Sequence, residues 1–128
     1  MSEINAVVDR YVSFWNERDP ERRRMLAARV FVDELRYVGP LITAESRGEI
    51  EAVAQRLASE MPGFTLRPIG EVEEHHDRLR FRWEISRPDG ETRFAAGTDI
   101  AVVAEDGRLR AITVFLDQPP AADGDHHE

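Results

Sequence analysis

The sequence predicts an α+β domain in which helices pack on one face of a mainly antiparallel sheet. Apolar residues recur with helical spacing before Gly63, and the pattern changes to strand alternation after it. Glycine-containing turns then separate the alternating segments, at Pro88-Asp89-Gly90 and Glu105-Asp106-Gly107. Helices followed by a run of strands are typical of this fold class. The length of 128 residues suits one domain.

Three helices are expected before Gly63. The first covers residues 4–16, where one face is apolar at the i, i+3, i+4, i+7 spacing. That face consists of Ile4, Val7, Val8, Tyr11, Phe14 and Trp15. The second begins at Pro20 with Asp19 as its N-cap and ends near Phe31. The third follows Ser46, with Glu49 at the capping-box position, and ends near Glu60.

One short strand is expected between the second and third helices, at residues 35–38 after a link at 32–34. After Gly63 we expect strands at residues 64–69, 71–76, 78–86, 92–104 and 109–116, the second of which is alternatively a lead-in to the third. The domain is expected to cover residues 1–117. The remaining residues, 118–128, form a polar, proline-containing tail that we expect to be disordered.

The composition excludes several functions. A net charge of −8 argues against a nucleic-acid partner. The absence of cysteine excludes disulfides and thiolate chemistry, and the absence of lysine excludes a Schiff base. No histidine or acid spacing matches a zinc or di-iron site, so no metal and no cofactor are expected. The sequence shows neither a signal peptide nor a membrane span, so we expect a cytoplasmic protein that contacts no membrane.

Asp99 is the strongest candidate for a functional residue, and its position depends on one turn. A two-residue Asp89-Gly90 loop would pair Asp99 with Arg80, on the arginine face. A three-residue loop that includes Pro88 would place Leu79 opposite Asp99, and Asp99 would share the face of Phe81 and Trp83. The second register is favoured. It would bury the carboxyl group and raise its pKa. The alternative is a carboxylate bonded to Arg80 or to backbone amides.

Aromatic residues are the candidates for the wall of an apolar pocket. They are either ligand contacts or ordinary core. The candidate substrate-binding residues are Trp15, Tyr37, Phe81, Trp83 and Phe115. Gly97 marks a bulge or the close approach of a ligand to the strand.

Arginines at positions 78, 80 and 82 alternate along one strand and face away from the predicted pocket. They form either a solvated face or, with apolar residues of the return strand, the seam of a homodimer.

Several segments resemble the NTF2-like superfamily, in particular its SnoaL-like branch. They run in order from residues 10–16 through Tyr37-Val38-Gly39-Pro40, residues 75–83 and Gly97-Thr98-Asp99 to residues 106–109. The resemblance implies a cone in which three N-terminal helices pack on a curved sheet around an apolar pocket. It also implies dimerisation through the outer face of the sheet.

The ketosteroid isomerases of this superfamily pair an acid with a tyrosine on the first helix, and the resemblance places Asp99 and Tyr11 at these positions. The general base of those isomerases is an aspartate before a proline, and Gly39 occupies that position here. His75, expected to face inward in phase with Leu79, is a candidate replacement base. The candidate catalytic residues are therefore Asp99, Tyr11 and His75.

Three functions remain open from the sequence. The first is a cofactor-free isomerase, cyclase, hydratase or dehydratase acting on a small apolar substrate. The second is a non-catalytic module that binds a small hydrophobic ligand. The third is a dimeric interaction protein with a vestigial pocket. This fold hosts many activities, so the fold alone does not choose between them.

Overall fold

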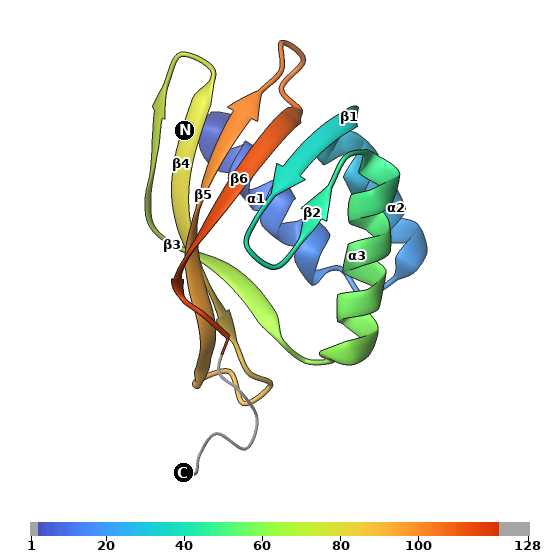
Figure 1. Cartoon of the computed structure of the whole chain (residues 1–128), viewed down its shortest axis with the longest axis vertical. Helices are drawn as coiled ribbons and strands as arrows, with labels where there is room; N and C mark the ends of the chain where they lie inside the picture. The colour runs from blue at the N-terminus through green and yellow to red at the C-terminus, as the bar shows by residue number, and fades with distance from the viewer. Residues whose placement is uncertain (1–2, 121–128) are drawn as a thin grey trace.

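Three helices pack on one side of a curved six-stranded sheet in the computed structural model, which describes residues 3–120 (Figure 1). The helices are α1 (Glu3–Asn16), α2 (Pro20–Val30) and α3 (Arg47–Glu60). The strands are β1 (Phe31–Val38), β2 (Thr43–Ala44), β3 (Thr65–His75), β4 (Arg78–Ser86), β5 (Arg93–Val103) and β6 (Leu109–Gln118). They lie in the order β2-β1-β6-β5-β4-β3. The predicted α+β class, with three helices on a curved and mainly antiparallel sheet, is confirmed.

The helices begin where the capping residues predict. The Asp19 side chain accepts a hydrogen bond from the Arg22 amide at 2.9 Å, at the start of α2. At the start of α3, Ser46 Oγ accepts from the Glu49 amide at 3.1 Å. The Glu49 carboxylate accepts from the amide of Glu45, one residue before the position that a standard capping box uses. No helix among residues 3–120 is long and apolar enough to span a bilayer.

The predicted link at 32–34 belongs to β1, which starts directly after α2. β1 pairs in parallel with β6, and its register shifts between Phe31 and Arg36. Phe31, Leu35 and Tyr37 are buried, but Asp33, which alternation would place on the same face, is exposed, so simple alternation is lost in this segment. Because of this irregularity, the pattern of apolar residues did not predict residues 31–34 as part of the strand. The two-residue strand β2, paired with the end of β1, was also not predicted.

The two strands predicted between residues 64 and 76 are one strand, β3. Its pairing with β4 shifts between Ile69 and Glu73, and Gly70 lies between them with a φ of +74°. A glycine in this left-handed conformation lets the strand bulge and bend without ending. Gln118 still belongs to β6, beyond the predicted end of the domain at residue 117. Of the remainder of the predicted tail, Pro119 and Pro120 are described and belong to no strand, whereas residues 121–128 lie outside the described residues.

The hairpin between β4 and β5 differs from the predicted register by two residues. Arg87 and Thr92 are joined by a 2.8 Å backbone hydrogen bond, so four residues form the loop instead of three. A further register shift follows, between Ile85 and Ser86. Asp99 therefore opposes Phe81, whereas Leu79 was predicted opposite it. Two shifts of one residue each leave the alternation unchanged, so Asp99 still lies on the predicted face.

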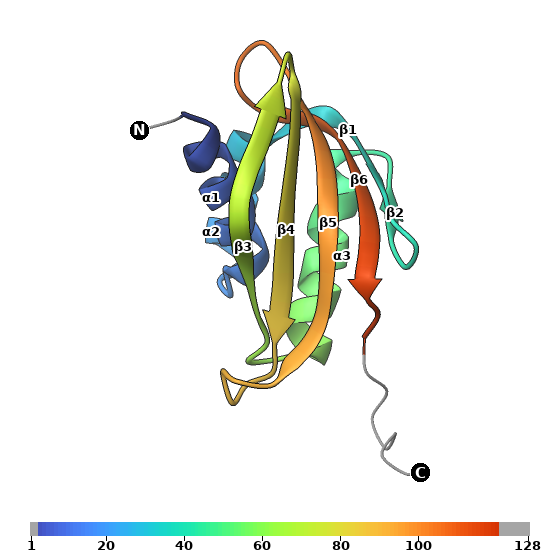
Figure 2. The same cartoon turned by 90° about the vertical axis from the view of Figure 1, so that its left-hand side faces the viewer.

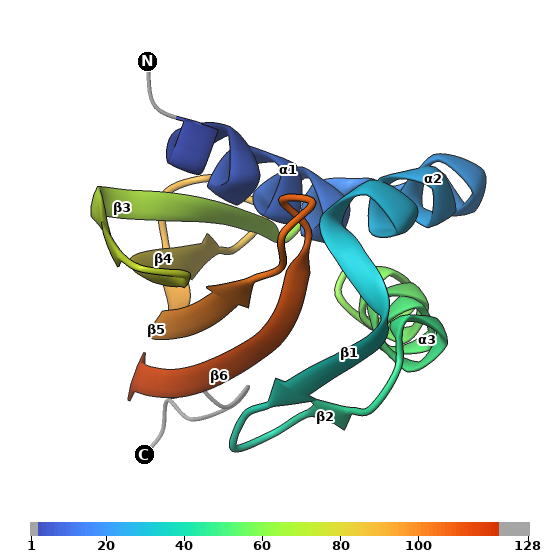
Figure 3. The ribbon, with the colours of Figure 1, turned by 90° about the horizontal axis from the view of Figure 1, so that it is seen from above.

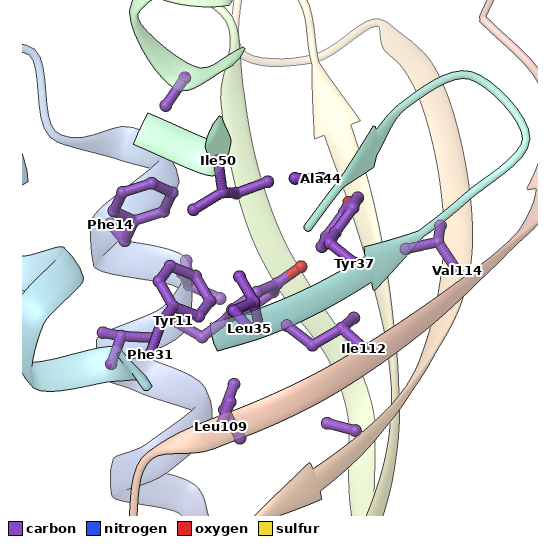
Figure 4. Packing of buried hydrophobic residues seen from close by; sticks show 14 of the residues in the cluster. Tyr11, Phe14, Phe31, Leu35, Tyr37, Ala44, Ile50, Leu109, Ile112 and Val114 are labelled. Atoms are coloured by element: carbon purple, nitrogen blue, oxygen red, sulfur yellow. The ribbon is translucent and has the colours of Figure 1, made fainter. Parts of the chain in front are cut away.

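The core fills the concave side of the sheet, where α1 and α3 face it (Figure 3). Phe14, Phe31, Leu35, Ile50 and Ile112 are buried almost completely and join both helices to the sheet. Figure 4 shows these side chains packed around Tyr11 and Tyr37. The core therefore fills one part of the concave space. The pocket described below occupies the other part, and Tyr11 and Tyr37 lie at the boundary between them.

The opposite face of the sheet carries no helix (Figure 2). Its charged side chains largely neutralise one another: Glu84 is only 5% exposed and pairs with both Arg67 and Arg93. Hydrogen bonds from these two arginines lower the pKa of Glu84. The outer face is therefore a mixed surface of ion pairs and apolar side chains.

Candidate functional site

Asp99 is a carboxyl group buried among aromatic side chains, with 1% of its surface exposed. Its Oδ2 accepts a hydrogen bond from the Tyr11 hydroxyl at 2.7 Å, and its Oδ1 accepts from Trp83 Nε1 at 2.7 Å. Arg80, the alternative partner considered from the sequence, pairs with Glu73 on the outer face. Asp99 makes no ion pair within the described part of the chain.

Burial controls the titration of this cluster. Removal from water raises the pKa of Asp99 to about 6, and the hydrogen bonds from Trp83 and Tyr11 limit the rise. Burial, followed by the charge of Asp99, also raises the pKa of Tyr11 and that of Tyr37. Both tyrosines therefore keep their hydroxyl protons at neutral pH, and Asp99 is the group that titrates.

Asp99 acts through its two partners. Both of its oxygens accept from protein donors, and it does not line the neighbouring pocket, whereas Tyr11 and Trp83 do. A carboxylate held in this way fixes the orientation of the phenol and the indole. Asp99 therefore reaches the pocket only through Tyr11 and Trp83.

Gly97 explains why Trp83 can reach Asp99. The two residues are direct cross-strand neighbours on β4 and β5. A Cβ atom at position 97 would lie 2.3 Å from Trp83 Cζ2 and 2.7 Å from the Phe115 carbonyl oxygen. The indole ring therefore lies over the bare backbone of Gly97, so the close approach at this glycine is made by a side chain of the protein, whereas the sequence suggested a ligand. The same glycine also adjoins a register shift between β5 and β6.

A pocket of about 180 Å³ opens beside this cluster, between the concave face of the sheet and helices α1 and α3. Its deep wall includes Tyr11, Tyr37 and Trp83, and its open side includes Leu41, which is 67% exposed. Most of the remaining wall is aliphatic or aromatic. These lining residues include Trp15, Ile42, Ala54, Leu57, Ala58, Met61, Phe64, Leu66, Ile85, Val114 and Leu116.

The structure brings together most of the predicted site. Tyr11, Trp15, Tyr37 and Trp83 all line the pocket. Phe81 lies behind them, with its ring centroid 5.5 Å from that of Tyr11, and is buried without lining the cavity.

Two predicted residues lie elsewhere. Phe115 points from β6 to the outer face and is 58% exposed, so its predicted position in the pocket is wrong. His75 pairs with Arg78 across a tight turn, so it shares the outer face with that arginine and is exposed. The prediction that His75 faces inward carried the alternation of β4 straight through the turn, but the two-residue His76-Asp77 connection reverses it.

Two residues at and after the end of α1 were not predicted to belong to the site. Asn16 pairs with the backbone of Leu66 through two hydrogen bonds, of 2.8 and 2.9 Å, which ties the end of α1 to β3. Arg18 lines the pocket and donates to the Phe64 carbonyl oxygen. These hydrogen bonds join residues far apart in the sequence, so no local pattern reveals them. Within residues 3–120, no group of three or more acids and histidines is placed to hold a metal ion.

Solved structures show the family. A candidate isomerase of the SnoaL-like family from Agrobacterium tumefaciens is 32% identical, with a TM-score of 0.85; the match covers 91% of this chain and 99% of that one. An NTF2-like protein of unknown function from an Exiguobacterium species is 23% identical with a TM-score of 0.70, over 88% and 99% of the two chains.

A candidate SnoaL-like polyketide cyclase from a Jannaschia species is 13% identical with a TM-score of 0.66, over 87% and 85% of the chains. At these lower identities the likeness shows the fold alone. No family model and no curated protein matches the sequence. The fold, the tyrosine–aspartate cluster beside an apolar pocket and the 32% identity over nearly the whole chain agree, and the chain belongs to the SnoaL-like family of NTF2-like proteins.

Proposed function

We propose that the pocket binds a small, mostly apolar molecule that carries one hydrogen-bonding oxygen. The aliphatic and aromatic wall suits the apolar body, and the hydroxyl groups of Tyr11 and Tyr37 offer polar contacts at the deep end. Because the Tyr11 hydroxyl donates its proton to Asp99, its oxygen is fixed in place as an acceptor. The Tyr37 hydroxyl is then the donor for a ligand carbonyl oxygen.

The size of the cavity limits the ligand. An engineered apolar cavity of about 150 Å³ accepts benzene. A volume of about 180 Å³ therefore suits one ring or a short chain, with any further part of the ligand extending through the open side. A four-ring steroid does not fit within it.

The observation that favours binding over catalysis is the composition of the wall. Among residues 3–120, no carboxylate and no imidazole lines the pocket. Gly39 lines it, at the position where the resemblance to ketosteroid isomerases implies their base. General base catalysis needs a proton acceptor within hydrogen-bond reach of the ligand. Asp99 already accepts from two protein donors and lies behind them.

The first test uses acetophenone, a single ring with one carbonyl oxygen. Trp15 and Trp83, the two tryptophans of the chain, both line the pocket, so saturable quenching or shift of tryptophan fluorescence is the expected signal. Ala58→Phe should weaken binding by about tenfold or more, because its ring takes the space of two or more ligand methylene groups. Ala52→Phe, on the exposed side of the same helix, should bind as wild type does. Unchanged binding in Ala58→Phe would place the ligand elsewhere.

A second candidate function is cofactor-free catalysis by isomerisation, cyclisation, hydration or dehydration. It is favoured by the coupling of Asp99 to the pocket residue Tyr11. When Asp99 is protonated it can donate to the Tyr11 oxygen, and the Tyr11 hydroxyl can then donate to a developing oxyanion. The 32% identical relative is itself a candidate isomerase. Proton exchange from the acetophenone methyl group into D₂O, followed by NMR, separates the two functions. Enzyme-dependent exchange that is lost in Tyr11→Phe would support catalysis, and exchange at the buffer rate would support binding alone.

We also propose a homodimer formed through the outer face of the sheet. Phe115 is exposed there beside Thr98 and Arg82, and Arg82 forms no ion pair within residues 3–120. Arginine beside aromatic groups is typical of interfaces. Sedimentation at tens of micromolar should show a dimer in wild type and a monomer in Phe115→Asp. Met25→Asp, which changes an exposed residue of α2, should remain dimeric. A wild-type monomer at these concentrations would rule out the seam.

A further inference from the structure

Arg18 is the one charged side chain that lines the pocket within the described part of the chain. Tyr11 lies more than one turn before the end of α1, and Arg18 lies two residues beyond that end. It is exposed, so it lies toward the open side of the pocket while the Tyr11 hydroxyl lies at the buried end. The two polar contacts are therefore separated by an apolar stretch.

Most N–H groups of the Arg18 guanidinium have no acceptor among the described residues. Its Nη2 donates to the Phe64 carbonyl oxygen at 2.8 Å, and it makes no ion pair within residues 3–120. Its acidic neighbours are engaged locally: the Glu17 carboxylate accepts from the Asp19 amide, and the Asp19 carboxylate accepts from the Arg22 amide. Four of the five N–H groups of Arg18 thus have no acceptor among the described residues.

A second arginine holds this segment in place. Arg23 is 3% exposed, and its guanidinium donates to the carbonyl oxygens of Glu17 and Arg18 and to Gln55 Oε1. No carboxylate pairs with Arg23 within residues 3–120. The buried cation fixes the backbone that carries Arg18 and adds positive potential at this end of the pocket. Glu17 and Asp19 keep their negative charges beside Arg18, so the selective feature is placement: Arg18 lines the pocket, and no carboxylate among residues 3–120 does.

We propose that the ligand of this pocket is a monocarboxylate with an apolar body. Its carboxylate pairs with Arg18 at the open side, and a separate oxygen at its other end meets the hydroxyls of Tyr11 and Tyr37. The inference rests on the proposed binding function and specifies its ligand class. A guanidinium fork matches a carboxylate in geometry and charge. A cationic ligand would meet Arg18 with no acid in the wall to compensate, and a neutral ligand would leave its donors unused.

The test compares 3-(4-acetylphenyl)propanoate with its primary amide, using tryptophan fluorescence at low ionic strength. Both probes carry the acetophenone group, and they differ in the charge at the other end. Wild type should bind the carboxylate about tenfold more tightly than the amide, and added salt should reduce the difference. Arg18→Gln should bind both probes equally, and Arg18→Lys should keep part of the preference because it retains the charge without the fork.

Arg22→Gln is the matched control. It removes the same charge from an exposed position four residues away whose side chain does not line the pocket, and it should keep the wild-type preference. Equal binding of the two probes by wild type, or a preference that survives in Arg18→Gln, would overturn the monocarboxylate assignment while leaving the binding function standing. Absence of any fluorescence response to acetophenone and to both probes would overturn the binding function itself.

Discussion

Gly97→Val is expected to lower the free energy of unfolding by about 3 kcal/mol, because there is no room for its side chain. Even a Cβ atom would lie 2.3 Å from Trp83 Cζ2, and the neighbouring contact at 2.7 Å is with backbone, which cannot rotate away. The indole must leave its place, and its 2.7 Å hydrogen bond to Asp99 is then lost. Urea unfolding measures the loss of stability, and near-ultraviolet circular dichroism reports the displaced tryptophan.

Gly48→Ala provides the control for this substitution. Gly48 lies in the first turn of α3, and the nearest atom to an added Cβ there is Ser46 Oγ at 3.9 Å. Alanine favours the helix, so this variant should be more stable than wild type by about 0.5 kcal/mol. A Gly97→Val protein with wild-type stability and an unchanged tryptophan spectrum would show that the indole does not cover Gly97.

Asp99→Asn is expected to change how stability depends on pH. The folded protein holds Asp99 with a pKa of about 6, against 3.8 for an ordinary aspartate, so the folded state binds more protons between these two values. The stabilisation from protonated Asp99 is therefore complete below about pH 4 and is lost as the pH rises through 6. Over that range, the stability of wild type relative to Asp99→Asn should fall by about 3 kcal/mol.

The comparison has to be a difference between the two proteins. Other acids act in the opposite direction: a hydrogen bond from the Thr92 side chain lowers the pKa of Asp89 to about 2, and hydrogen bonds from Arg67 and Arg93 lower that of Glu84. These contributions are common to both proteins and cancel. Urea unfolding at pH 4, 5, 6 and 7 supplies the two curves. If they run parallel, Asp99 is not a buried acid with a raised pKa.

Tyr11→Phe tests the same cluster from its other side. Without the phenol hydroxyl, Asp99 Oδ2 loses its donor in a buried place, which costs about 1–3 kcal/mol when the carboxylate is charged. The loss should be larger at pH 7.5 than at pH 4.5, where Asp99 is protonated. An equal loss at both values would mean that the hydroxyl does not act on the carboxylate.

The sequence was sufficient for the helices and for the face of Asp99. The N-caps at Asp19 and Ser46 are short-range hydrogen bonds, so local residues specify them. The alternation of β4 separated its inner side chains from its arginines. The predicted register differs from the observed one by two residues. Because side chains alternate between the two faces of a strand, Asp99 still lies on the predicted face.

Pairings between distant segments could be decided only by the tertiary structure. The parallel contact of β1 with β6, the tie between Asn16 and Leu66, and the place of Arg18 at the pocket each join residues far apart in the chain. His75 and Phe115 were misplaced because alternation cannot be extended through a turn or assigned to a strand without its partners. Local sequence sets which residues share an element, whereas the enclosure of a pocket depends on how separate elements meet. For this reason the sequence suggested that Asp99 and Tyr11 act together, whereas only the folded chain showed that Trp83, lying over Gly97, donates a second hydrogen bond to Asp99.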